Sequence, residues 1–180
     1  MELLRELAGG FPDAAKDLRL NLTSVLGEST LSEGQRWLVA LSCALSKNDH
    51  ALARAIVADA GAAASEALVD DAKAVAALMA MNNVYYRFRH MVGKETYSQM
   101  PARLRMNRLG SPKTSKADFE LASLAVSALA GCEMCVRAHE QNVLAHGLGE
   151  AQVHDAVRIA AAIAGASTAN SLAGFAPAGV

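Results

Sequence analysis

Aromatic residues are scarce in this chain, at 4% of 180 residues with one tryptophan, and β-branched residues are few beside alanine. Such a composition favours closely packed helices over sheets. Because 52% of the residues are apolar, the chain can bury a core and is not expected to be disordered. We therefore expect an all-α fold: a single-domain helical bundle over residues 1–180.

An excess of charge of either sign is also missing, since 17 basic and 18 acidic residues give a net charge of −1. This balance disfavours nucleic acid as a partner. The N-terminus has no basic segment followed by an apolar one. The longest near-apolar runs, 124–131 and 159–166, are far shorter than the roughly 18 residues of a membrane span. We expect no membrane association and a cytoplasmic location.

The chain has three cysteines, an odd number: Cys43, Cys132 and Cys135. An odd count argues against an extracellular disulfide framework, and in a reducing compartment a cysteine pair more often serves catalysis or metal binding. Cys43 is interpreted as a small buried apolar residue.

Helical periodicity and start signals account for most of the chain. They predict helices over about 11–26, 31–46, 50–60, 65–81, 116–130, 132–146 and 149–173. Residues 85–112 are the least regular and are expected to form short helices and a long connection. Asn82, Asn83, Tyr85, Tyr86 and Arg87 are expected to end a helix, as a pocket wall, a subunit contact or a set of buried amide hydrogen bonds.

An approximate internal repeat is present at an offset of 84 residues. Residues 65–77 and 149–161 are identical at seven of thirteen positions. The sequence therefore predicts two degenerate repeats, approximately 32–86 and 116–170, of which only the second carries the C-x-x-C pair. Chance similarity between alanine-rich helices is the alternative.

The segment whose side chains could carry out a reaction runs from Glu120 to His139. It contains Cys132, directly after Gly131, and Cys135. If a helix begins there, Cys132 lies at its N-terminus, where free N–H groups favour a thiolate. The two cysteines and His139 share one helix face. This spacing suits a nucleophilic thiol, a second thiol that resolves its oxidised product, and a base.

Glu120 lies near the start of the preceding helix. Antiparallel packing of the two helices would bring its carboxylate toward His139, and a carboxylate beside an imidazole fixes the imidazole tautomer. Alternatively, Glu120 is a first-turn charge that complements the helix dipole.

Other interpretations of the thiol pair remain open. A zinc site could use Cys132, Cys135 and His139, but it would need a fourth ligand such as Cys43 or His146. A thioredoxin-like motif would need a preceding strand, which is not predicted. An inert buried pair is the third possibility. The remaining histidines (His50, His90, His146 and His154) are interpreted as surface or cap residues, and Lys113 and Lys116 as solvated charges.

Several segments together resemble the alkyl hydroperoxidase D family of the carboxymuconolactone decarboxylase-like superfamily. The matching segments are 16–18, 20–22, 81–87, 104–107, 119–120, 125–128, 131–135 and 138–140. The likeness covers nearly the whole chain. It implies an all-α homotrimer that reduces organic hydroperoxides and contains no bound cofactor or metal.

By the same resemblance, Cys135 is the peroxide-attacking thiol, Cys132 is its disulfide partner, and His139 and Glu120 belong to a proton relay. Dihydrolipoamide on a lipoylated acyltransferase is the implied electron donor, and a peroxiredoxin is the implied partner. Family members can carry a relay histidine directly before the second cysteine, where this chain has Met134. The rival functions are a carboxymuconolactone decarboxylase-type lyase and a non-enzymatic, zinc-stabilised helical interaction protein.

Overall fold

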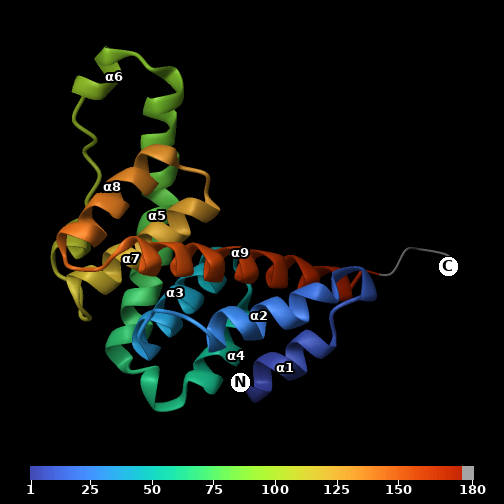
Figure 1. Cartoon of the computed structure of the whole chain (residues 1–180). Coiled ribbons are helices and arrows are strands. Elements are labelled where there is room, and N and C mark those ends of the chain that lie inside the picture. Colours follow the sequence, from blue (N-terminus) through green and yellow to red (C-terminus); the bar gives the residue numbers. More distant parts are fainter. Residues whose placement is uncertain (176–180) are drawn as a thin grey trace.

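The computed structural model describes residues 1–175, and within them the chain forms helices and no strand (Figure 1). The α-helices are α1 (Glu2–Gly9), α2 (Asp17–Gly27), α3 (Glu33–Ser46), α4 (His50–Ala60), α5 (Glu66–Val92), α6 (Glu95–Gln99), α7 (Lys116–Leu129), α8 (Glu133–Ala145) and α9 (Glu150–Ala173). Three short 3₁₀ turns are η1 (Asp13–Ala15), η2 (Gly61–Ala63) and η3 (Asn107–Gly110). The expected all-α fold is confirmed.

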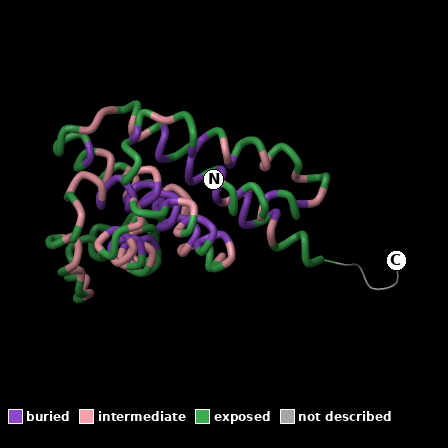
Figure 2. Tube along the Cα trace, turned by 90° about the horizontal axis from the view of Figure 1, so that it is seen from below, coloured by how far each residue is buried: buried purple, intermediate pink, exposed green. Residues whose placement is uncertain are grey.

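Two helices, α3 and α7, form the centre of the body. Residues 37–44 of α3 and 119–127 of α7 are all buried. A helix that is buried on every side must be covered on every side, and both helices pack against α5 and α9 as well as against each other. Figure 2 shows the buried stretches along the inside of the body.

The α5 helix is longer than the sequence predicted. It continues without interruption from Glu66 to Val92, past the expected end near residue 81, because no glycine or proline occurs before Gly93. Gly93 adopts φ +64°, a left-handed conformation that glycine reaches without strain, and it ends the helix. Asn82 and Asn83, expected near a helix end, are instead buried within the helix.

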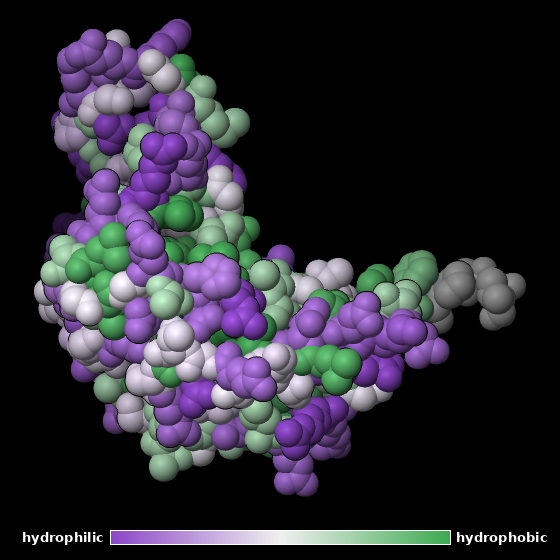
Figure 3. Space-filling model, in the orientation of Figure 1, coloured by the Kyte–Doolittle hydropathy of each residue, from purple (hydrophilic) through white to green (hydrophobic). Residues whose placement is uncertain are grey.

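The upper part of α5 and the connection through α6 project from the body as an arm (Figure 1). The predicted short helices and long connection therefore occur over residues 93–115 rather than from residue 85. Figure 3 shows hydrophobic surface where the arm meets the body. The buried Asp71 carboxylate anchors the return of the chain, since it accepts hydrogen bonds from Arg108, the Lys113 N–H and Thr114.

Two differences from the sequence prediction occur at the N-terminus. An unpredicted helix, α1, begins at Glu2, and its first N–H groups donate to Asp59 of α4. The helix expected from residue 11 is a 3₁₀ turn followed by α2 from Asp17.

The starts of α3, α4 and α5 precede those of α7, α8 and α9 by 83, 83 and 84 residues. Asn48 and Gly131, which precede the first residues of α4 and α8 by two positions, both have positive φ, at 57° and 65°. These spacings support the predicted repeat, which stays a prediction. Among residues 1–175, no helix combines the length and the apolar character needed to cross a bilayer.

Asp155 on α9 ties the α2–α3 connection to the body. Its nearly buried carboxylate accepts hydrogen bonds from the Thr30 N–H, the Thr30 and Ser29 hydroxyls, and Arg158. Burial by itself would raise the pKa of Asp155, but these donors outweigh it and lower the pKa to about 2. The folded state therefore favours the ionised form.

We expect Asp155→Asn to lower the free energy of unfolding by about 2 kcal/mol at pH 7, because the folded pKa lies below the unfolded value of about 3.9. The stabilisation is complete above pH 4 and disappears as the pH falls through about 2. Urea titrations of both proteins at pH 7 and at pH 3 measure this. A difference between the proteins that is equally large at both pH values would contradict the assignment.

Candidate functional site

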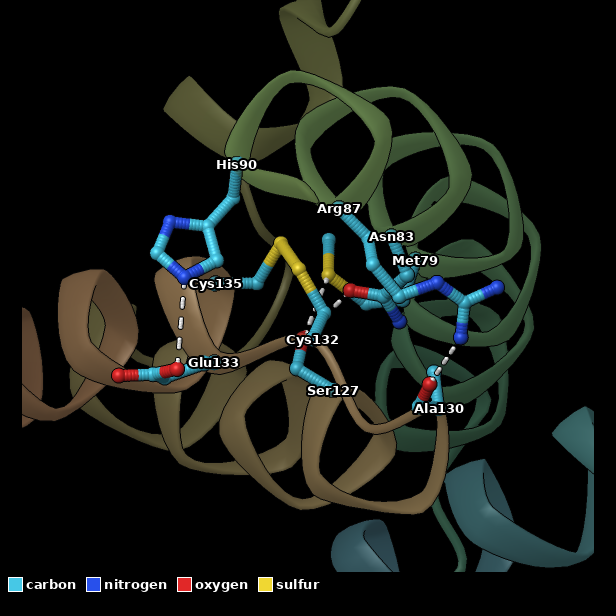
Figure 4. The surroundings of a disulfide bond; sticks show 9 residues. All are labelled: Met79, Asn83, Arg87, His90, Ser127, Ala130, Cys132, Glu133 and Cys135. Carbon is cyan, nitrogen blue, oxygen red and sulfur yellow. Dashed lines mark hydrogen bonds and ion pairs between the residues drawn. A yellow bond between two sulfur atoms is a disulfide. The ribbon is translucent and has the colours of Figure 1, made fainter. Parts of the chain in front are cut away.

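The two thiol sulfurs lie in a single turn at the start of α8. Gly131, with φ +65°, turns the chain into the helix, Cys132 is its N-cap residue, and Cys135 lies in its first turn. The two cysteines form a disulfide with a Cα–Cα distance of 5.3 Å (Figure 4). Cys132 is fully buried and Cys135 is 6% exposed. The thiols are therefore shielded from bulk solvent, and Cys135 is the more accessible one.

The start of α8 differs from those of α3, α4, α5 and α7. Each of those helices has a serine or aspartate side chain that accepts a hydrogen bond from a first-turn N–H. Within the described chain, the Cys132 side chain makes no such bond. The free N–H groups and the positive end of the helix dipole therefore favour a thiolate at this turn.

Glu120 and His139 meet between α7 and α8, as the predicted antiparallel packing requires. His139 Nδ1 lies 2.6 Å from Glu120 Oε2, and the Glu120 side chain is only 4% exposed. Lys116 Nζ lies 2.7 Å from Glu120 Oε1, and Asn142 Nδ2 donates to Oε2 at 3.2 Å. Both carboxylate oxygens are thus occupied, and the contact with Nδ1 leaves His139 Nε2 available for proton transfer.

The environment of Glu120 determines its charge. Burial would raise the pKa of Glu120, but hydrogen bonds from His139, Lys116 and Asn142 and the charge of His139 outweigh it and lower the pKa to about 2. The carboxylate is therefore ionised throughout the neutral range. It can hold an imidazole in place and balance its charge, whereas it is too weak a base to remove a thiol proton by itself.

One face of α5 covers the disulfide. Met79, Asn83, Arg87 and His90 recur at helical spacing, and all four lie in its surroundings (Figure 4). The Ser127 hydroxyl donates to Asn83 Oδ1 at 3.0 Å, and Arg87 donates to the Ala130 carbonyl at 2.5 Å. These bonds fasten the end of α7 to α5 and so fix the turn that carries the cysteines.

His90 and Glu133 bridge α5 and α8 beside Cys135 (Figure 4). His90 Nε2 lies 3.4 Å from Glu133 Oε2, and both side chains are about half exposed. A surface hollow of about 310 Å³ adjoins this pair and is lined by residues of α8 that include Met134 and Arg137. It lies on the thiol-bearing helix, next to the His90–Glu133 pair that flanks Cys135.

Sequence reasoning missed three groups of this site: Lys116, Asn142 and His90. Lys116 was interpreted as a solvated charge, although its position four residues before Glu120 is the spacing of a helical ion pair. The sequence alone indicates no more for His90 than a surface or cap residue, since the predicted helix ends near residue 81. A continuous α5 would have placed His90 seven residues after Asn83 on the same face.

The third cysteine is separate from the thiol turn. Cys43 is fully buried, as predicted, and burial raises the pKa of its thiol, so it is unreactive. His146 contacts the Asn142 carbonyl. Across residues 1–175, no group of three or more His, Cys, Asp or Glu side chains is placed to hold a metal ion.

The chain is similar to known proteins over nearly its whole length. Residues 95–178 match the carboxymuconolactone decarboxylase family. The chain is 55% identical over 176 residues to "Alkyl hydroperoxide reductase AhpD" of Anaeromyxobacter sp. (strain K), covering 98% of this chain and 95% of the relative. Proteins of the same name from Anaeromyxobacter dehalogenans (strain 2CP-C) and Rhodospirillum centenum are 56% and 48% identical, covering 99% and 92% of this chain and 96% and 89% of the relatives.

Proposed function

We propose, since this chain belongs to the alkyl hydroperoxide reductase AhpD family, that it is an oxidoreductase that reduces organic hydroperoxides with Cys132 and Cys135. The observation that carries the proposal is the disulfide between these residues within the first turn of α8. Two thiols at this spacing alternate between dithiol and disulfide with movement of a single turn. A lyase of the decarboxylase type has no need of them.

The reaction begins at Cys135, the more accessible sulfur. Its thiolate attacks the terminal oxygen of ROOH, the O–O bond breaks, and the alkoxide takes a proton to leave as ROH. Cys135 is then a sulfenic acid. The Cys132 thiolate attacks that sulfur and displaces hydroxide, which is protonated to water as the disulfide forms. The two electrons that reduce the peroxide thus come from the thiol pair.

His139 moves the protons in this scheme, and Glu120 holds it in position. The 2.6 Å contact from Glu120 orients the ring, and the ionised carboxylate compensates the charge of an imidazolium. Met134 occupies the place where relatives can carry a second relay histidine. His90 brings another imidazole to the same surroundings from α5 (Figure 4).

Dihydrolipoamide on a lipoylated acyltransferase is the proposed electron donor. The donor thiolate attacks the more exposed sulfur, Cys135, and its proposed approach is from the side of the hollow that adjoins His90 and Glu133. Cys132 then leaves as a thiolate at the helix N-terminus, where the free N–H groups stabilise it. Transfer of electrons onward to a peroxiredoxin would follow the same exchange chemistry. No bound cofactor is required in this cycle.

The chain is proposed to form a homotrimer. The exposed apolar surface of the arm supports self-association. Six of the large hydrophobic side chains that the described chain exposes lie between residues 84 and 100: Val84, Phe88, Met91, Val92, Tyr97 and Met100. Such a concentration of apolar surface is typical of an interface. The number of subunits follows from the family resemblance, and sedimentation equilibrium measures it.

One experiment tests the function directly. Reduced protein is treated with one equivalent of cumene hydroperoxide and weighed by mass spectrometry. We expect a loss of about two mass units, the two thiol hydrogens, in wild type and in neither Cys132→Ser nor Cys135→Ser. An unchanged mass for the wild type, with the hydroperoxide unconsumed, would overturn the proposal.

A further inference from the structure

Three hollows on the surface follow one another along α5, and each shares lining side chains with the next, so that together they make a groove. The first, of about 320 Å³, lies between α3, α4 and the start of α5, with Val57 and Val69 in its wall. The second, also about 320 Å³, shares Leu45 and Lys73 with the first and continues along α5. The third, about 180 Å³, shares Ala80 with the second and ends at residues 83 and 130.

The inner end of this groove lies at the thiol turn. Asn83 and Ala130, which line the third hollow, both belong to the surroundings of the disulfide (Figure 4). Asn83 is 3% exposed, and among residues 1–175 its Nδ2 has no hydrogen-bond partner while its Oδ1 accepts from Ser127. A buried N–H donor without an acceptor destabilises the folded protein. A ligand oxygen at the end of the groove would supply the acceptor.

The charge along the groove has one sign. His50, Arg54 and Lys73 line the outer hollow, Lys47 lines the inner one, and no acidic residue of the described chain lines any of the three. Among residues 1–175, neither Arg54 nor Lys73 takes part in a salt bridge. Arg54 also lines a neighbouring hollow, which contains Glu6 and is not part of the groove. The outer end therefore suits an anion.

Between its two ends the groove is apolar and is lined by small side chains. Ala76, Ala77 and Ala80 present only methyl groups from α5, opposite Leu45 and the end of α3. From Val69 to Asn83 the helix rises about 21 Å, at 1.5 Å per residue. One lipid tail spans about 15 Å, half of a bilayer's hydrocarbon core. The groove is long enough for one extended acyl chain and its head group.

We propose that this groove binds long-chain fatty acid hydroperoxides as substrates of the thiol pair. The carboxylate of the fatty acid lies at Arg54 and Lys73, the chain follows the alanine face of α5, and the hydroperoxide group accepts the Asn83 N–H at the inner end, in the surroundings of the disulfide. This inference rests on the proposed peroxide reduction and adds its substrate class. The bond changes are those already written, with the thiol pair as the reductant.

The test compares second-order rate constants for oxidation of the reduced full-length protein by three probes: linoleic acid hydroperoxide, its methyl ester and cumene hydroperoxide. We expect wild type to prefer the free acid to the ester by about five- to tenfold, since the two ion pairs with Arg54 and Lys73 are exposed and each contributes modestly to binding. In the double variant Arg54→Gln/Lys73→Gln the ratio of acid to ester is expected to fall to near one. Arg5→Gln, an exposed cation on α1, is the matched control and is expected to keep the wild-type ratio.

A second variant tests the apolar middle of the groove. Ala80→Leu fills the junction of the second and third hollows, so we expect it to lower the ratio of linoleic acid hydroperoxide to cumene hydroperoxide by about tenfold. Equal rates for acid and ester in wild type would overturn the inference, and so would an unchanged ratio in the double variant. The inference would also be overturned if the variants changed the sedimentation of the protein and left these ratios unchanged. Reduction of cumene hydroperoxide without these preferences would leave the proposed function standing, whereas no reaction with any probe would remove both.

Discussion

Cys135→Ser is expected to abolish peroxide reduction, lowering the rate by at least about a thousandfold, because the attacking nucleophile is gone. Cys132 remains, but it is fully buried, and it is placed to resolve an oxidised partner rather than to meet the peroxide. Consumption of cumene hydroperoxide by the reduced variant, followed in a single turnover, measures the loss.

Cys132→Ser is the matched variant for this experiment. It should consume one equivalent of peroxide and stop, gaining about 16 mass units as the sulfenic acid of Cys135. The opposite pattern, with a burst in Cys135→Ser and none in Cys132→Ser, would exchange the roles of the two thiols.

Glu120→Gln is expected to slow oxidation of the thiol pair by about 10²-fold, the lower end of the contribution of a positioned proton relay. The amide cannot balance an imidazolium and does not fix the tautomer of His139 as a carboxylate does. The disulfide should still form, only slowly. Because the pKa of Glu120 is about 2, wild type should show no change in rate from this carboxyl between pH 4 and pH 9.

Two controls accompany the Glu120 measurement. Glu150→Gln removes an exposed first-turn carboxylate from α9 and should leave the rate unchanged. The free energy of unfolding of Glu120→Gln should fall by about 3 kcal/mol at pH 7, since a folded pKa below the unfolded one stabilises the protein above about pH 4 and ceases to do so toward pH 2. A normal rate in a stably folded Glu120→Gln protein would remove this residue from the relay.

Local signals in the sequence located most of the helices and the central contact of the site. Serine start signals gave the starts of α3 and α5, and Gly131 gave the start of α8. The meeting of Glu120 with His139 followed from two consecutive helices joined by a short turn. These features depend on residues close together in the chain, which a single sequence displays directly.

The remainder depended on contacts between distant segments. Asn82 and Asn83 are residues typical of a helix end, but packing of α5 against α7 overrides that local preference. The Ser127 hydroxyl of α7 donates a hydrogen bond of 3.0 Å to Asn83 Oδ1. Because the predicted helix ended near residue 81, neither the position of His90 beside the disulfide nor the groove along α5 could be predicted. In α1, by contrast, Leu3, Leu4, Leu7 and Ala8 carry a helical spacing that could have been recognised.

The bond between Cys132 and Cys135 spans three positions, and that shortness has a thermodynamic consequence. Cross-linking so small a loop removes little freedom from the unfolded chain, less than the roughly 3 kcal/mol of a 15-residue loop. The fold therefore rests on its apolar interior in either oxidation state. Repeated opening and closing of the bond during turnover leaves the protein almost equally resistant to unfolding.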